Sequence, residues 1–177
     1  MKRVLLTLIC TVAAFVATAQ NGIAENKPLN IKFQGYFNLG LIYCPEVIGI
    51  GPIVDASVGA AITDYFYAGV ETGFHSLFYK VYFANRQYYR LDGYIPIALN
   101  MRSYFTKTKA RPFVNVSLGG WVGVANLKGY GGFYFQTGAG VDIQNLSVGL
   151  GYSGLVVSGT ASSLYVKLGI RFGGKRY

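Results

Sequence analysis

The sequence predicts an all-β protein: a transmembrane, up-and-down antiparallel β-barrel of about eight strands that follows a cleaved signal peptide. Three observations carry this prediction. Apolar residues recur at every second position in about eight segments between Ile31 and Phe172, which is the period of strands with two unlike faces. A secretion signal precedes these segments. Charged residues make up only 13% of the chain, too few to solvate an ordinary globular surface.

The start of the chain has the three parts of a signal peptide. Met1–Arg3 carry positive charge, Val4–Val16 form an apolar run, and Ala17–Ala19 have the small residues of an A-x-A cleavage site. Cleavage is therefore expected between Ala19 and Gln20. The apolar run is shorter than the roughly 20 residues that a membrane-spanning helix needs.

The remainder is predicted to form one domain. Residues 20–29 are expected to be a periplasmic N-terminal extension, and residues 30–177 the outer-membrane β-barrel domain. No Pro/Ser-rich linker divides the domain, and no later stretch is apolar and long enough for a spanning helix. After cleavage, Cys44 is the single cysteine, so the fold is expected to form without an intramolecular disulfide.

The first four strands are predicted from alternating segments. The first sets Ile, Phe and Leu against Lys, Gln, Tyr and Asn; the second sets Val, Ala and Ile against Asp, Ser and Gly. The third sets Phe, Ala and Val against Tyr, Gly and Glu; the fourth sets Leu, Ile and Met against Arg, Asp, Tyr and Asn. Pro96 lacks a ladder donor, so a bulge or an irregular pair is expected beside it. These segments are residues 31–43, 54–62, 65–74 and 89–102.

The last four strands follow the same rule. The fifth and seventh set Val and Leu against small and polar residues, and the sixth sets Phe, Ala and Val against Tyr, Gln and Asp. The eighth is the most regular, with Leu164, Val166, Leu168, Ile170 and Phe172 on one face. These segments are residues 114–124, 133–143, 146–152 and 163–172.

The connections between these segments alternate in length. Outer-membrane barrels have short periplasmic turns and longer external loops, so the alternation places both termini in the periplasm. The three short connections are Thr63–Asp64, Thr106–Ala110 and Gln144–Asn145. The four long ones are Cys44–Pro52, His75–Tyr88, Ala125–Gly132 and Ser153–Ser162.

A soluble barrel would also alternate, with its apolar face inward, so the composition of the polar face has to distinguish the two. That face is mostly Gly, Ser, Asn and Tyr, with about one or two charges per strand, which suits a confined lumen better than a soluble exterior. Aromatic residues gather near the expected strand ends, where rings can lie at the membrane interfaces. The membrane barrel is therefore favoured.

On these residues the chain resembles the small outer-membrane β-barrel proteins of Gram-negative bacteria, which include the OmpA-type transmembrane domain and porin-family barrels. The resemblance covers about residues 30–172. Leu164–Phe172 is similar to the terminal alternation that the barrel assembly machinery recognises in such proteins, although Gly173–Arg176 separate it from the terminal Tyr177. The resemblance implies location in the cell outer membrane, contact with its lipids and lipopolysaccharide, and insertion by that machinery.

The charged residues of the polar face are candidates for a network inside the lumen. An ion-pair network that also fixes strand register is favoured over a selectivity ring, because an eight-strand lumen is barely wide enough for its own side chains. Several glycines also face inward and leave room, so a narrow, porin-like channel for water, ions or small solutes stays open as an alternative. The candidate residues are Lys32, Asp55, Glu71, Arg90, Asp92, Arg102, Arg111, Asp142, Lys167 and Arg171.

The expected external loops are the other candidate for function. Residues 77–83 are apolar and prone to form strands, so the third and fourth strands are expected to extend as a hairpin that could recruit a protein partner by strand addition. The alternative is that these rings pack on neighbouring loops or lipopolysaccharide. Lys80, Arg86 and Lys128 are candidates to contact lipopolysaccharide phosphates.

An enzymatic role is the least favoured interpretation. Some barrels of this size modify lipid A with a histidine and a serine at the external rim, and His75 and Ser76 lie at about that height. Adjacent strand residues point to opposite faces, so the simpler interpretation of His75 is a histidine at the membrane interface. No catalytic residue, metal site or cofactor is predicted. The scattered basic residues predict no nucleic-acid interface, and a closed barrel needs no second subunit, so a monomer is expected.

The leading hypothesis is therefore a non-enzymatic outer-membrane barrel with a structural, surface-interaction or envelope-maintenance role.

Overall fold

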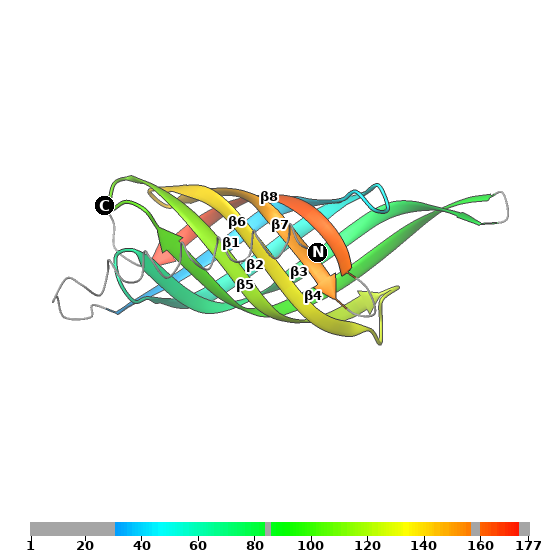
Figure 1. Ribbon diagram of the computed structural model, residues 1–177, viewed down its shortest axis with the longest axis horizontal. Helices are drawn as coiled ribbons and strands as arrows, with labels where there is room; N and C mark the ends of the chain where they lie inside the picture. The colour runs from blue at the N-terminus through cyan, green and yellow to red at the C-terminus, as the bar shows by residue number, and fades with distance from the viewer. Residues whose placement is uncertain (1–30, 84–85, 157–159, 174–177) are drawn as a thin grey trace.

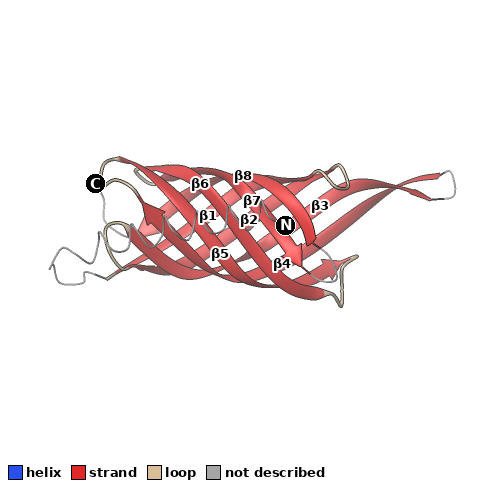
Figure 2. Cartoon of the chain, in the orientation of Figure 1, coloured by secondary structure: helices blue, strands red, loops and turns tan. Residues whose placement is uncertain are grey.

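Eight antiparallel strands form one closed barrel (Figure 1). The computed structural model describes residues 31–83, 86–156 and 160–173, and every regular element in them is a strand (Figure 2). Within these ranges no helix is long and apolar enough to cross a membrane. The strands are β1 (Lys32–Cys44), β2 (Gly49–Ala61), β3 (Phe66–Phe83), β4 (Arg86–Tyr104), β5 (Ala110–Ala125), β6 (Gly131–Ile143), β7 (Leu146–Val156) and β8 (Thr160–Gly173).

Each strand pairs with its neighbours in sequence, and the pairing of β1 with β8 closes the barrel. The closing register runs from Gln34 opposite Gly173 to Tyr43 opposite Leu164. Closure leaves no sheet edge without hydrogen-bond partners along the barrel wall, which is the condition for strands in lipid. The predicted strand number and up-and-down order are confirmed.

The outer wall of the barrel is apolar and the interior is polar. Leu99, Leu150 and Leu168, for example, are 62%, 66% and 62% exposed. Asp55, Ser117 and Asp142 are fully buried on the inside. A soluble barrel has the opposite arrangement, so the structure decides the question that alternation alone left open in favour of a membrane barrel.

The two ends of the barrel differ. β1 begins and β8 ends at one of them, here called the terminal end. β2, β4, β6 and β8 begin at the other, here called the hairpin end. The β3–β4 hairpin, with strands of 18 and 19 residues, extends well beyond the other strands there (Figure 1). The extended hairpin expected from the sequence is therefore confirmed.

The long loops expected at the hairpin end are mostly strand. The β1–β2 connection is only residues 45–48, and the β5–β6 connection only residues 126–130. Backbone hydrogen bonds between antiparallel strands need no regular side-chain pattern, so the ladders continue past the alternating segments. The predicted loop bounds were wrong for that reason.

Pro96 interrupts the ladder on one side only. On the β5 side it pairs with Trp121 in an unbroken register. On the β3 side, pairing stops after Thr72–Ile97 and resumes at His75–Tyr94. The register is the same before and after the gap, so no residue is inserted. The expected irregular pair is present without a bulge.

Rings and polar side chains fill the space that the inward glycines leave. A Cβ on Gly138 or Gly151 would collide with the hydroxyl of Tyr165, and one on Gly140 with the ring of Phe113. These close approaches require glycine. The glycines therefore admit large side chains from neighbouring strands, so the room expected beside these three glycines is occupied.

Candidate functional site

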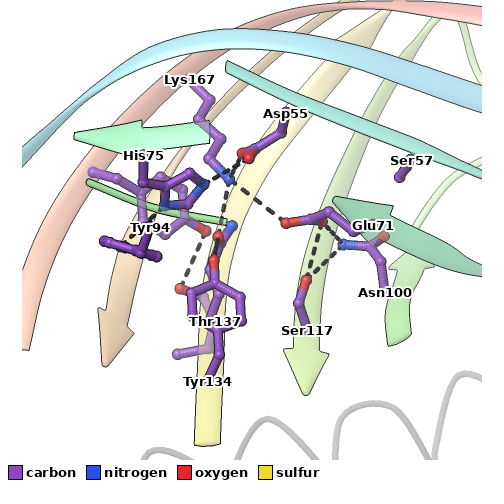
Figure 3. Close-up of polar contacts among 12 residues, drawn as sticks. Asp55, Ser57, Glu71, His75, Tyr94, Asn100, Ser117, Tyr134, Thr137 and Lys167 are labelled. Atoms are coloured by element: carbon purple, nitrogen blue, oxygen red, sulfur yellow. Dashed lines mark hydrogen bonds and ion pairs between the residues drawn. The ribbon is translucent and has the colours of Figure 1, made fainter. Parts of the chain in front are cut away.

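The middle of the lumen is held by four side chains, here called the central cluster: Asp55 of β2, Glu71 and His75 of β3, and Lys167 of β8 (Figure 3). The Lys167 ammonium forms an ion pair with Asp55 Oδ2 and lies 3.9 Å from Glu71 Oε1. All four residues are at least nine-tenths buried. Asp55 therefore lies in the middle of the lumen.

Neutral side chains complete the central cluster. Lys167 Nζ donates to Gln136 Oε1 at 2.9 Å. Asn100 Nδ2 and Ser117 Oγ donate to Glu71 Oε2 at 2.6 and 3.1 Å. These bonds reach across the lumen from β4, β5 and β6. Because buried charges are costly unless they are paired and hydrogen-bonded, this arrangement ties the barrel wall together through its interior.

His75 belongs to the lumen. Its Nε2 lies 2.6 Å from Asp55 Oδ1 and its Nδ1 lies 3.0 Å from the Tyr94 hydroxyl, and none of the residue is exposed. The simpler interpretation of it as a membrane-interface histidine was wrong, because strand parity directs it inward. Ser76 is on the opposite face of β3, so the two do not form a nucleophile and base pair.

A second cluster lies in the lumen nearer the terminal end. The Arg102 guanidinium lies 3.9 Å from the ring centres of both Tyr36 and Phe113. Its NH1 also donates to Asp142 Oδ1 at 3.1 Å, while the Tyr104 hydroxyl donates to Asp142 Oδ2 at 3.0 Å. This set is here called the terminal cluster. Cation–π contacts and a charge-assisted hydrogen bond hold one arginine in place.

Three more predicted lumen residues lie at the terminal end. Arg111 is buried, donates to the Asp64 carbonyl oxygen at 2.6 Å and lies 3.8 Å from the Tyr104 ring centre. Arg171 is buried in β8. Lys32 is half-buried at the first residue of β1.

Arg90 and Asp92 stand apart from both clusters. Arg90 Nε donates to Asp92 Oδ1 at 2.9 Å, and the Tyr79 hydroxyl donates to Asp92 Oδ2 at 2.7 Å. These residues lie in the extended β3–β4 hairpin, where the Arg90 side chain is 45% exposed. Desolvation and the Asp92 carboxylate raise the pKa of Tyr79 to about 12.

The predicted lipopolysaccharide contacts lie at the hairpin end. Lys80 is exposed, with its ammonium 5.7 Å from the Tyr89 ring centre, and Lys128 is exposed in the β5–β6 turn. Arg86 begins β4, but its side chain is outside the described part of the chain. The signal peptide, the cleavage site at Ala19 and Gln20, and residues 20–29 lie outside the described residues as well.

Two cavities differ sharply in size and character. A cavity of about 20 Å³ lies between the central and terminal clusters, lined by polar residues that include Asn38, Asn115 and Gln136. A cavity of about 420 Å³ lies at the hairpin end, lined largely by apolar residues that include Ile42 and Trp121. In the described ranges no group of His, Cys, Asp and Glu could hold a metal ion.

Sequence reasoning missed the neutral members of these clusters. Tyr36, Asn100, Tyr104 and Gln136 all bond to the charged residues. The alternation of inward and outward residues along each strand identified the face on which they lie. It carries no information on which residues meet across the lumen.

Comparison with known proteins shows the fold. No protein-family model and no curated protein matches the sequence. Among solved structures, Neisserial surface protein A (NspA) is similar with a TM-score of 0.55 and 17% identity, over 80% of this chain and 95% of that one. The N-terminal β-barrel domain of Pseudomonas aeruginosa OprF is similar with a TM-score of 0.48 and 12% identity, over 80% of this chain and 97% of that one.

The chain has the fold of the small eight-stranded outer-membrane barrels. The likeness to NspA covers nearly all of that chain, and both the strand number and the apolar outer wall agree with it. The resemblance predicted from the sequence is confirmed at the level of the fold. At this identity a shared fold does not assign a shared role.

Proposed function

We propose that this chain is an integral outer-membrane protein with a closed lumen and a non-enzymatic role in envelope structure or in surface interactions. Its apolar outer wall supports contact with membrane lipids, and its fold supports an outer-membrane location. In this arrangement the terminal end faces the periplasm and the hairpin end faces the exterior.

The observation that carries the closed lumen is the pair of clusters stacked along it. Lys167 joins β8 to β2 at one level, and Arg102 joins β4 to β6 at the other. The polar cavity between them, at about 20 Å³, has room for about one water molecule. A continuous water path would need both clusters to rearrange.

Single-channel conductance in planar bilayers tests this proposal. The protein is refolded, its barrel is verified by heat-modifiable gel mobility, and the current is recorded beside that of lipid alone. The expected result is a folded barrel without conductance steps. Reproducible steps that change in Lys167→Ala or Arg102→Ala, and not in the exposed control Lys80→Ala, would overturn the closed lumen.

A narrow channel is the second candidate. The polar cavity favours it, because Asn38, Asn115 and Gln136 could hold water between the clusters. Osmotic swelling of proteoliposomes would detect a water path that carries no ions. Swelling no faster than that of empty liposomes is the result that the closed lumen requires.

The hairpin end supports the surface role. Lys80 and Lys128 are exposed there and, with Arg86, form our proposed contacts to lipopolysaccharide phosphates. Binding to lipopolysaccharide vesicles should weaken when all three are replaced by alanine. Equal binding of this variant and the native protein would rule these contacts out. A protein partner on the β3–β4 hairpin, insertion by the barrel assembly machinery and a monomeric state complete the proposal.

Lipid A modification is not favoured. The imidazole of His75 is engaged by Asp55 and Tyr94 inside the lumen. Mass spectrometry of lipid A from cells that express the native protein or His75→Ala should give the same products. A lipid A product that disappears with His75→Ala would restore the enzymatic hypothesis.

A further inference from the structure

The extended β3–β4 hairpin keeps two unlike faces after it leaves the barrel wall. Its pairing with β2 ends at Ile50–Phe78 and its pairing with β5 ends at Asp92–Ala125, while β3 and β4 stay paired with each other beyond these points. Figure 1 shows this part continuing along the long axis of the molecule. Since successive strand residues point to opposite sides, one face continues the lumen side of the barrel and the other continues its outer wall.

The lumen side of the hairpin is engaged in its own contacts. Tyr79 and Arg90 pair across the two strands, and both donate to the Asp92 carboxylate, at 2.7 and 2.9 Å. Leu77 lies opposite Asp92 on the same face and packs against Ile53 inside the barrel. This face is therefore directed toward the barrel axis.

The opposite face, here called the outward hairpin face, has three pairs of directly opposed residues that change in chemistry with height. The pairs are Phe78 with Leu91, Lys80 with Tyr89, and Tyr82 with Gln87. The lowest pair is apolar, the middle pair joins an ammonium to a ring centre 5.7 Å away, and the highest carries a hydroxyl and an amide. All six residues are exposed, and Tyr82 and Tyr89 are 74% and 77% exposed. A contiguous patch of exposed rings marks an interaction surface.

The outward hairpin face is continuous with the lipid-facing wall of the barrel. Phe74 of β3 and Ile97 of β4 lie on the same face nearer the middle of the barrel and are 43% and 56% exposed. Phe78 and Leu91 follow them toward the hairpin end. Membrane lipid surrounds the outer wall of such a barrel, so continuity assigns the surface of the same membrane to the pairs above.

The height of the hairpin decides which kind of lipid reaches it. β1 and β2 have 13 residues each, more than the roughly 9–11 tilted residues that cross the hydrocarbon core, so the last β2–β3 pair, Ile50–Phe78, lies at the outer boundary of that core or above it. At a rise of about 3.3 Å per residue and a tilt of about 40°, Tyr82 stands about 10 Å higher than Phe78. A phospholipid headgroup layer is only about 5–8 Å thick. The deeper saccharide layer of lipopolysaccharide reaches Tyr82.

We propose that the outward hairpin face docks on lipopolysaccharide: acyl chains lie against the lowest pair, a phosphate beside Lys80, and saccharide over the rings of Tyr89 and Tyr82. The order of the pairs matches the order of acyl chain, phosphate and sugar in that lipid, and the ammonium is complementary in charge to the phosphate. This inference rests on the proposed outer-membrane location and deepens the surface role, since it assigns one face of one hairpin to one lipid.

A tryptophan in the highest pair tests which face the lipid covers. Trp121 is the only tryptophan of the chain, so Tyr82→Trp in a Trp121→Phe background places a single tryptophan on the outward hairpin face. The protein is refolded into phosphatidylcholine vesicles with and without lipopolysaccharide, and fluorescence quenching by acrylamide, a neutral solute, is compared. Lipopolysaccharide should remove about half of the quenching, because the ring then lies within the lipid surface.

Tyr88→Trp in the same background is the matched control. Tyr88 lies opposite Val81 on the lumen side of the hairpin and is 50% exposed, and its quenching should not change with lipopolysaccharide. No further protection at Tyr82→Trp would leave phospholipid or a protein partner as the occupant and would overturn the proposal. Equal protection at both positions would overturn it as well. Gel mobility shows that each barrel has formed.

A binding measurement that keeps Trp121 tests the rings without relying on that background. Binding of lipopolysaccharide to the protein in phosphatidylcholine nanodiscs is followed by native mass spectrometry. Replacing Tyr82 and Tyr89 together by serine should weaken binding about five-fold or more, whereas Tyr88→Ser should leave it unchanged. Equal affinity of the double variant and the native protein would overturn the role of the rings.

Lipopolysaccharide whose phosphates have been removed enzymatically tests the contact at Lys80. The native protein should bind it about five-fold more weakly than the intact lipid, as expected when a charge-assisted contact is lost, and the difference should be smaller in Lys80→Ala. The same difference in both proteins would overturn the placement of a phosphate beside Lys80. The closed lumen is tested by conductance, so failure of the docking face and failure of the closed lumen are distinguishable.

Discussion

The central lumen and the hairpin end belong to the same barrel but are lined by opposite kinds of side chain. In the lumen, each charge of the central cluster meets a partner from another strand, and almost no space is left. At the hairpin end, apolar side chains surround a cavity of about 420 Å³. The paired charges stabilise the barrel from within, whereas the apolar side chains at the hairpin end leave open space.

Removing the charge shared by the central cluster should have the largest effect on stability. Lys167→Met leaves Asp55 and Glu71 buried without their cation, which should cost about 3–5 kcal/mol. Urea unfolding in lipid vesicles measures the loss. Lys80→Met, at an exposed lysine, should change stability by less than about 0.5 kcal/mol. A similar small loss for both variants would show that the lumen does not depend on its charge pairing.

The terminal cluster offers a comparison of buried and exposed pairs through the same substitution. Asp142→Asn weakens the bond to buried Arg102 and should cost about 2–3 kcal/mol. Asp92→Asn weakens the bond to half-exposed Arg90 and should cost less than about 1 kcal/mol. Unfolding free energies of the two variants test the order. A larger loss for Asp92→Asn would contradict it.

The inward glycines should tolerate no side chain where a ring approaches. Gly138→Ala brings a Cβ against the Tyr165 hydroxyl and should cost about 1–3 kcal/mol through overpacking. The cost should fall only in part in a Tyr165→Phe background, because the Leu150 carbonyl oxygen would still lie 2.7 Å from the new Cβ; a double-mutant cycle of unfolding free energies would detect the difference. At Gly120 a Cβ would make only ordinary contact at 3.5 Å, so Gly120→Ala should be nearly neutral. An equal loss at both glycines would argue against ring packing as the cause.

The smallest effect is expected at the hairpin, at high pH. Because the pKa of Tyr79 is raised to about 12 from its ordinary value near 10, the fold favours the neutral phenol. Its contribution is complete below about pH 10 and is lost as the pH rises through 12. In tyrosine-selective ¹³C NMR the Tyr79 resonance, assigned by its loss in Tyr79→Phe, should titrate above the ordinary range, and Asp92→Asn should lower its midpoint. An unchanged midpoint would show that Asp92 is not the partner that matters.

Two-residue periodicity was sufficient to predict the barrel and the faces of its strands. Alternation such as that of Leu164–Phe172 determines which side chains face lipid, since successive strand residues point to opposite sides. The residues at which the strands begin and end were less predictable. The apolar residues 77–83 predicted the extended hairpin. The other strand ladders continue into segments that were expected to be loops, because backbone pairing depends little on side-chain pattern.

For the candidate site, too, the sequence predicted one part and the tertiary structure decided the other. The sequence by itself determined that Asp55, Glu71, Arg102, Asp142 and Lys167 face inward. Only the tertiary structure decided that Lys167 meets Asp55 and that Arg102 meets Asp142, because these pairings depend on the register with which β1 closes on β8 and on which side chains reach across the lumen. The large cavity at the hairpin end likewise exists only when strands far apart in the sequence meet, since no local segment contains more than a few of its lining residues. Periodicity is a local property of a strand, whereas contact across a barrel is a property of the closed ring.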